Sequence, residues 1–109
     1  MHAQEIVHRD MKLENILINQ EGAIKIIDFG FATRCKEHQK LDYMVGTPHY
    51  MDPDLARKAP CNGWGADIWA LGVILFTLLT AKLPFFGEFE EDLFRRIISG
   101  KYTYPIDLH

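Results

Sequence analysis

His8-Arg9-Asp10-Met11-Lys12-Leu13-Glu14-Asn15 is the stretch that organises this chain of 109 residues, and it lies between two short apolar runs. A loop of this composition can hold the Asp10 carboxylate beside a reacting hydroxyl, while the Lys12 ammonium neutralises negative charge on a transferred group. Asn15 offers an uncharged oxygen to a hard divalent cation. The stretch therefore predicts a loop that carries chemistry.

A second carboxylate follows at Asp28-Phe29-Gly30, directly after the apolar run Ala23-Ile24-Lys25-Ile26-Ile27. This run and Ile16-Leu17-Ile18 are rich in β-branched residues, and Asn19-Gln20-Glu21-Gly22 between them has turn chemistry. The pattern predicts a β-hairpin. Two paired strands would bring Asn15 and Asp28 to the same end of that hairpin.

The two motifs together resemble those of the protein kinases. Residues 8–15 resemble the kinase catalytic loop, and residues 28–30 resemble the kinase metal-binding motif. The alternative is a solvated charged turn followed by a strand end that Asp28 caps, and it does not account for the full eight-residue pattern. The resemblance implies an α+β fold: the large (C-terminal) lobe of a kinase, mainly helical with a short β-hairpin, incomplete and without the small lobe.

The resemblance covers the chain as one partial kinase domain, residues 1–109. Its expected parts are the catalytic loop at 8–15, the metal motif at 28–30, the activation segment at 28–54, a central helix at about 67–80 and a following helix at about 90–99.

Both expected helices have a distinct apolar pattern. The segment from Asp67 to Leu79 is apolar nearly all round, which predicts a helix buried on every side. The resemblance implies that Asp67, a structural residue at the start of this helix, bonds the backbone of the catalytic loop. In the second helix Leu93, Phe94, Ile97 and Ile98 share one face, and Gly100 ends it. Arg95 and Arg96 lie opposite, where a solvated face is the simpler interpretation.

Residues 31–44 are polar and show no sustained period, which predicts a mobile surface loop. The resemblance implies a switch here, in which Arg9 pairs with a phosphate on the loop; the alternative for Arg9 is a surface salt bridge. The usual acceptor position falls on Tyr43, Asp42 could supply a permanent charge, and Thr33 is a further regulatory candidate. A loop that needs no switch stays an open alternative.

The segment Gly46 to Asp54 resembles the part of kinases that seats the substrate. A threonine at the Thr47 position bonds the catalytic acid and lysine in serine/threonine kinases, and together with Lys12 it argues against the tyrosine-specific branch. The family's Ala-Pro-Glu is here Asp52-Pro53-Asp54. Asp54 keeps the charge of the family's structural acid, whose expected partner is a later arginine, while Asp52 adds a charge near the substrate surface.

The resemblance also implies a role for each remaining site residue. Asp10 and Lys12 would be catalytic, and Asn15 and Asp28 would hold Mg²⁺ on ATP. Lys12, Leu17 and Asp28 would contact the nucleotide, with Leu17 as the floor beneath the adenine or else as ordinary core. Glu14 and Thr47 would contact the substrate, Glu14 by attracting a basic residue upstream of the acceptor. Phe29 and Gly30 would be structural.

Composition limits the partners. The net charge of −3 argues against nucleic acid or a membrane surface, because both favour clustered positive charge. Cys35 and Cys61 have no metal-ligand spacing and no secretory signal precedes them, which indicates an intracellular, cytoplasmic protein. The most apolar stretch, Ile68 to Leu79, is too short to cross a bilayer and indicates a core helix.

The sequence thus predicts a serine/threonine protein kinase that transfers the γ-phosphoryl group of ATP to a protein hydroxyl, with an activating kinase as a further partner. Leu13 loosely fits the calcium/calmodulin-dependent and related group. These 109 residues hold no glycine-rich phosphate loop, so we expect the isolated chain to be inactive. The alternative is a truncated, non-catalytic binding or regulatory protein, for which the intact site residues would have no chemical use.

Overall fold

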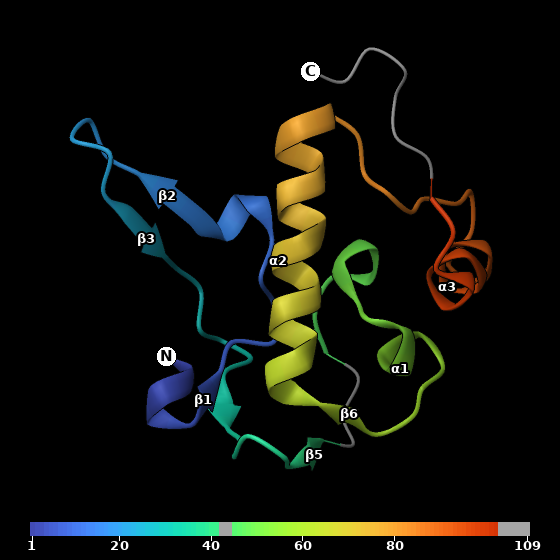
Figure 1. Cartoon of the computed structure of the whole chain (residues 1–109), viewed down its shortest axis with the longest axis horizontal. Helices are drawn as coiled ribbons and strands as arrows, with labels where there is room; N and C mark the ends of the chain where they lie inside the picture. Colours follow the sequence, from blue (N-terminus) through green and yellow to red (C-terminus); the bar gives the residue numbers. More distant parts are fainter. Residues whose placement is uncertain (42–44, 103–109) are drawn as a thin grey trace.

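The computed structural model describes residues 1–41 and 45–102, so Asp42 and Tyr43 lie outside the described part. The fold is α+β, as expected, with one long helix at its centre (Figure 1). The strands are β1 (Ile6–Val7), β2 (Ile16–Ile18), β3 (Ile24–Ile26), β4 (Thr33–Arg34), β5 (Lys40–Leu41) and β6 (Cys61–Asn62). The helices are α1 (Pro53–Ala56), α2 (Gly63–Thr80) and α3 (Glu90–Ser99), with 3₁₀ turns at His2–Gln4, Leu13–Asn15 and Pro48–Tyr50.

The β2–β3 pair is the hairpin next to the catalytic loop. Its strands are antiparallel, with Ile16 opposite Ile26. The Asn19 side-chain oxygen accepts from the N–H groups of Glu21 and Ala23 at 2.9 Å, and Gly22 has a φ of +84°, a conformation that glycine adopts without strain. The turn residues therefore fix the register that aligns the two ends of the hairpin.

Two further antiparallel pairs correct the expectation for residues 31–44. β4 pairs with β1, and β5 pairs with β6, so residues 33–34 and 40–41 are strands rather than the irregular loop that the polarity predicted. Each pair is only two residues long, which is too short to show an alternating pattern in the sequence. Together the pairs attach residues 33–34 to β1 and residues 40–41 to β6.

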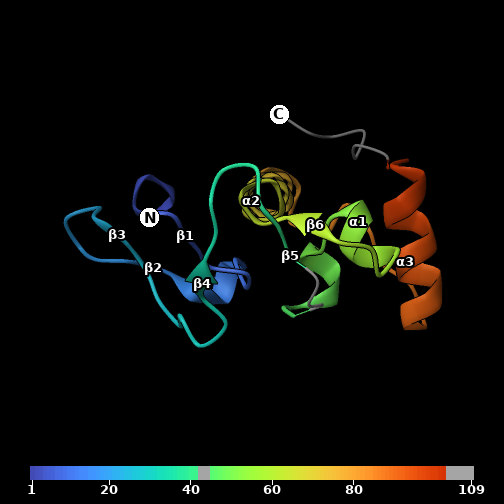
Figure 2. The same cartoon turned by 90° about the horizontal axis from the view of Figure 1, so that it is seen from below.

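Helix α2 lies between β1–β4 on one side and α1 and α3 on the other (Figure 2). It begins at Gly63, four residues before the predicted start at Asp67, because the Asn62 side chain accepts from the Gly65 N–H at 2.9 Å and caps it. Two glycines in the first turn hid this start, since glycine disfavours helices. Asp67 consequently lies inside the helix rather than at its cap.

The expectation that α2 is buried on every side is wrong. Ala70, Val73, Ile74 and Phe76 are buried, but a stripe on the other face is 42–67% exposed: Ile68, Leu71, Leu75, Leu78 and Leu79. With 18 residues and a mean hydropathy of 1.5, α2 also has the length and composition of a membrane span, although residues 68–79 alone are too short for one. Of this helix, 33% is buried. Asp67, which bonds the catalytic loop, identifies it instead as a core helix.

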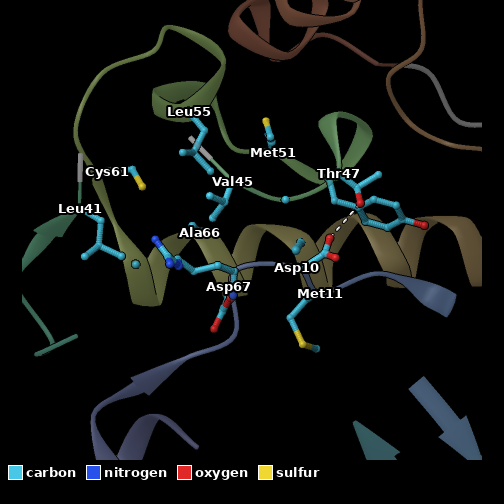
Figure 3. A pocket seen from close by; sticks show the side chains of 15 residues that line it. Asp10, Met11, Leu41, Val45, Thr47, Met51, Leu55, Cys61, Ala66 and Asp67 are labelled. Atoms are coloured by element: carbon cyan, nitrogen blue, oxygen red, sulfur yellow. Dashed lines mark hydrogen bonds between the residues drawn. The ribbon is translucent and has the colours of Figure 1, made fainter. Parts of the chain in front are cut away.

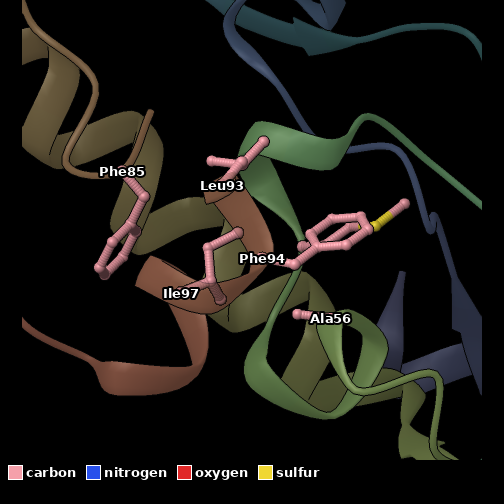
Figure 4. Close-up of a cluster of buried hydrophobic side chains, with 6 residues drawn as sticks. Ala56, Phe85, Leu93, Phe94 and Ile97 are labelled. Carbon is pink, nitrogen blue, oxygen red and sulfur yellow. The ribbon is translucent and has the colours of Figure 1, made fainter. Parts of the chain in front are cut away.

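The apolar core has two parts. One joins Met51 and α1 to α3 through Ala56, Phe85, Leu93, Phe94 and Ile97 (Figure 4). The other joins Met11 to Ala70 and Ile74 of α2, with the bases of both hairpin strands packed against it. The catalytic loop therefore rests on α2, and the substrate-seating segment rests on α3.

Helix α3 has the predicted bounds, and it ends before Gly100, whose φ is +69°. Two of its side chains differ from expectation. Ile98 is 36% exposed and is not on the buried face with Ile97. Arg96 is not simply solvated, because its guanidinium donates to the Phe86 carbonyl at 2.6 Å and lies 5.4 Å from the centre of that ring.

Candidate active site

The catalytic loop is held by a buried carboxylate of α2. Asp67, 2% exposed, accepts hydrogen bonds from the backbone N–H groups of His8 at 2.9 Å and Arg9 at 3.0 Å. The His2 ring nitrogen Nε2 lies 2.8 Å from the same carboxylate. A buried carboxylate is costly unless its oxygens are hydrogen-bonded, and here three groups satisfy it. The predicted bond between Asp67 and the loop backbone is thus present.

Two residues of the site have a left-handed backbone. Arg9 has a φ of +70° and Asp28 a φ of +62°. Such conformations cost of order 1–3 kcal/mol for residues other than glycine and persist where surrounding contacts impose them. At Arg9 the contacts are the Asp67 bond to its N–H and a 2.6 Å bond from its Nε to the Phe31 carbonyl. The turn at Arg9 directs the next residue, Asp10, to the other side of the loop.

His8 connects the catalytic loop to the metal motif. The ring is fully buried, its Nε2 lies 2.9 Å from the Ile27 carbonyl, and its Nδ1 lies 3.0 Å from the Asp10 N–H. A neutral ring with the proton on Nε2 satisfies both bonds. Phe29 packs edge-on against this ring at 4.8 Å between centroids. The base of the catalytic loop and the end of β3 therefore move as one body.

Asp10, Thr47 and Lys12 form one hydrogen-bonded group, of which Figure 3 shows the bond between Thr47 and Asp10. The Thr47 hydroxyl donates to Asp10 Oδ1 at 2.8 Å and accepts from Lys12 Nζ at 3.1 Å. Lys12 Nζ also lies 3.8 Å from Asp10 Oδ2. Asp10 is 8% exposed, so the ammonium interacts with it in a weakly solvated place. The arrangement fixes the orientation of the carboxylate and keeps a cation beside it.

Gly46 permits the close approach that this group needs. Its φ is +111°, and a Cβ at this position would lie 2.6 Å from the Arg9 carbonyl oxygen. Any other residue would push the substrate-seating segment away from the loop. Sequence reasoning placed Gly46 only as the first residue of a segment and missed this contact.

Asn15 and Asp28 lie at the same end of the hairpin, as predicted. The Ile27 N–H donates to the Asn15 carbonyl at 2.9 Å, so the ladder continues beyond the paired strands. The Asn15 side-chain nitrogen donates to the Asp10 carbonyl at 2.8 Å, which leaves its oxygen to face elsewhere. Asp28 is exposed and takes only a 3.3 Å bond from the Gly30 N–H.

This donor set suits Mg²⁺ bound together with a phosphate ligand. Mg²⁺ takes oxygen ligands and usually keeps several waters, so one carboxylate and one amide oxygen from the protein are sufficient beside phosphate oxygens. The described residues hold no cluster of three or more His, Cys, Asp or Glu side chains that could bind a metal without such a ligand.

The other predicted site residues are spread around this centre. Leu17 is 49% exposed on β2 and is therefore free to contact a ligand. Glu14 is exposed, and Thr33 is half-buried in β4. Within the described residues Asp54 lies 3.7 Å from Arg57, the following turn's arginine, with both side chains nearly half exposed.

Burial raises the pKa of two groups, the carboxyl of Asp52 within the substrate-seating segment and the thiol of Cys61. Burial raises the pKa of Asp52, whose side chain accepts from the Leu55 N–H at 2.9 Å and caps α1. Burial likewise raises the pKa of the Cys61 thiol to about 11. A cavity of about 30 Å³ lies between Asp10, Val45 and Asp67 (Figure 3), and it is large enough only for water. The cavity is therefore too small for an organic ligand.

His2 contacts the site, and no sequence pattern predicted this contact. It lies outside every motif, and its ring stacks on Trp64 of α2 at 4.9 Å while it bonds Asp67. Trp64 in turn donates to the Cys35 carbonyl at 2.8 Å. Only the three-dimensional arrangement brings the start of the chain to the helix that supports the site.

The fold and site match the expected partial kinase lobe, and comparison with known proteins agrees. The protein kinase domain family matches residues 1–107, so the chain belongs to the protein kinase domain family. It is 42% identical over 104 residues to mouse sperm motility kinases 3A and 3B, covering 95% of the chain and 21% of each relative. Mouse sperm motility kinase 2B is also 42% identical over 104 residues. The chain spans about a fifth of the length of these relatives.

Proposed function

We propose that this chain is the catalytic-loop and substrate-seating part of a serine/threonine protein kinase, which transfers the γ-phosphoryl group of ATP to a protein hydroxyl. The observation that carries the proposal is the group formed by Asp10, Thr47 and Lys12. It places a proton acceptor, a positioning hydroxyl and a cation within 2.8–3.8 Å of one another.

Asp10 orients the substrate hydroxyl and accepts its proton as the new bond to phosphorus forms. Lys12 stabilises the negative charge of the γ-phosphoryl oxygens from the same side. Most of the rate acceleration in such transfers comes from positioning and charge neutralisation, which this rigid group supplies. Thr47 keeps Asp10 directed toward the acceptor because its hydroxyl donates to the carboxylate.

Asn15 and Asp28 are the residues that would hold Mg²⁺, and Leu17 would lie beneath the adenine. Bound Mg²⁺ neutralises phosphate charge and orients the γ-phosphoryl group. The chain's own contribution is to fix both ligands at one end of the hairpin through the His8 and Ile27 bonds. Asp28 is exposed, so its carboxylate is accessible to a bound cation.

The proposed substrate is a serine or threonine in a segment with a basic residue upstream. The pairing of Thr47 with Lys12 supports the serine/threonine branch, as in the resemblance stated above. Exposed Glu14, on the same loop as Asp10, supplies the negative charge that would attract a guanidinium. Arg9 is proposed to pair with a regulatory phosphate carried by another residue of the activation segment. In this structure its Nε donates to the Phe31 carbonyl.

A segment exchange tests the proposal. Residues 1–104 replace the matching part of mouse sperm motility kinase 3A, and transfer from labelled ATP is measured on serine, threonine and tyrosine peptides with upstream arginine. We expect serine or threonine labelling that falls at least a thousandfold in Asp10→Asn and Asp28→Asn. The matched control Asp92→Asn, whose partly exposed side chain on α3 pairs with Arg95, should retain full activity.

Two results would contradict the proposal: tyrosine as the preferred acceptor, or full transfer by the Asp10→Asn hybrid. The 109-residue chain alone should transfer no phosphate, because its sequence has no glycine-rich loop to hold the ATP phosphates. Transfer by the isolated chain that is lost in Asp28→Asn would disprove this second expectation.

A further inference from the structure

The last turn of α3 combines an exposed hydroxyl with two arginines. Ser99 is exposed, and Arg95 and Arg96 precede it by four and three residues on the same side of the helix. We propose that Ser99 is a phosphorylation site for an arginine-directed serine kinase. The inference rests on the proposed function only if the enzyme is a second copy of the kinase that contains this chain.

The recognition chemistry follows from charge. Arginine pairs with carboxylates through a planar fork of donors, so an acidic group beside a kinase's catalytic loop selects arginine near the acceptor. Exposed Glu14 of this same chain is an acidic group of that kind.

The acceptor lies where the helix opens most readily. Ser99 is the last residue of α3, and Gly100 follows it with a φ of +69°. The Ser99 hydroxyl donates to the Arg96 carbonyl at 2.7 Å and accepts from the Lys101 N–H at 3.2 Å, both in exposed surroundings. Fully buried Ile97 opposes a longer opening. Fraying of the final turn is therefore the step that presents the serine.

The chemical step is a simple transfer. The Ser99 oxygen forms a bond to the γ-phosphorus of ATP, the bond from that phosphorus to the β,γ-bridging oxygen breaks, and ADP leaves. The hydroxyl proton passes to the catalytic carboxylate of the kinase.

The phosphate would change the contacts of Arg96. A dianion at a helix C-terminus is unfavourable, but arginines three and four residues before it can pair with the new charge. Arg96 now bonds the Phe86 carbonyl and covers its ring. Drawn toward the phosphate, it would release the segment that connects α2 to α3, residues 82–89.

The experiment uses a feature of the sequence: Ser99 is the only serine among the 109 residues, so any phosphoserine identifies it. The chain is incubated with a purified arginine-directed serine kinase, Mg²⁺ and γ-labelled ATP, beside a peptide of residues 93–102. We expect phosphoserine in both, none in Ser99→Ala, and at least tenfold slower labelling in Arg95→Ala and Arg96→Ala. In the labelled chain, amide exchange at residues 82–89 should quicken at least threefold.

If the peptide were labelled and the folded chain were not, the proposal would be overturned, because the helix would then protect the serine. Equal labelling of the arginine variants, or no phosphoserine at all, would also overturn it. A second arm omits the added kinase and uses the hybrid described above with ATP. Ser99 is the only serine within these 109 residues alone, so in the hybrid the phosphate is assigned by sequencing the peptide that contains residues 93–102, with Ser99→Ala as the control. Phosphate on Ser99 in both arms supports the site with self-phosphorylation, and phosphate on Ser99 only with the added kinase supports it with another enzyme.

Discussion

The two faces of α2 have similar composition and opposite environments. One face carries Asp67, Ala70 and Ile74, which are buried beneath the catalytic loop. The other carries the apolar stripe of Ile68, Leu71, Leu75, Leu78 and Leu79, which is exposed in the described chain. Apolar residues alone do not distinguish the faces. The polar residue Asp67 does, because its carboxylate can be satisfied only by the backbone of the loop.

This difference shows what positions the site. Hydrophobic burial is non-directional, whereas hydrogen bonds to two consecutive backbone N–H groups define one arrangement. The substitutions below should therefore have large effects on the loop-facing side of α2 and small effects on its exposed side.

Asp67→Ala should have the largest effect on stability. It leaves the N–H groups of His8 and Arg9 buried without an acceptor, at a cost of about 3 kcal/mol in the free energy of unfolding. Urea denaturation measures the change. Asp67→Asn, which keeps one acceptor oxygen, should lose less. If Asp67→Ala were as stable as the wild type, the loop would not depend on this carboxylate.

Substitution of two glycines by alanine should change the stability of the chain in opposite directions. Gly46→Ala should destabilise by about 2 kcal/mol, because its Cβ would lie 2.6 Å from the Arg9 carbonyl at a φ of +111°. Gly72→Ala on the exposed face of α2 meets nothing within 4 Å and should stabilise by about 1 kcal/mol. Thermal unfolding compares them. Equal effects at the two sites would contradict the difference between the faces.

The Asp52 cap should contribute less. Asp52→Ala removes the acceptor of the Leu55 N–H and should cost about 1 kcal/mol, whereas Asp52→Asn keeps the cap. Burial raises the folded-state pKa of Asp52, so the folded chain binds this proton more tightly than the unfolded chain. Acidification from neutral pH through that pKa should therefore stabilise the wild type relative to Asp52→Asn. Urea denaturation at pH 7 and pH 4 checks the sign.

The exposed stripe should matter least for stability and most for association. Leu75→Lys and Leu78→Glu are expected to change the free energy of unfolding by less than about 0.5 kcal/mol, since both side chains are more than half exposed. They should also reduce self-association, because a contiguous apolar patch is removed. Light scattering during size-exclusion chromatography measures this. Strong destabilisation by either substitution would show that the face is buried in solution.

The motifs made the loop, the hairpin and the partners of Thr47 predictable, because each depends on residues close in sequence or on a full family pattern. Which face of α2 is buried was not predictable, since both faces are apolar and their composition does not indicate which one packs against the rest of the chain. The two-residue strands β4 and β5 escaped because their pairing is set by distant residues, Val7 and Cys61 among them. His2 escaped for the same reason.

The most direct test of the central claim is the turnover of the kinase hybrid with one substitution on each face of α2. Asp67→Asn and Leu75→Gln are compared in the hybrid by initial rates of peptide phosphorylation per folded molecule. The account predicts at least a tenfold loss of kcat in Asp67→Asn and an unchanged kcat in Leu75→Gln. Equal kcat values for the two variants would mean that Asp67 does not position the catalytic loop.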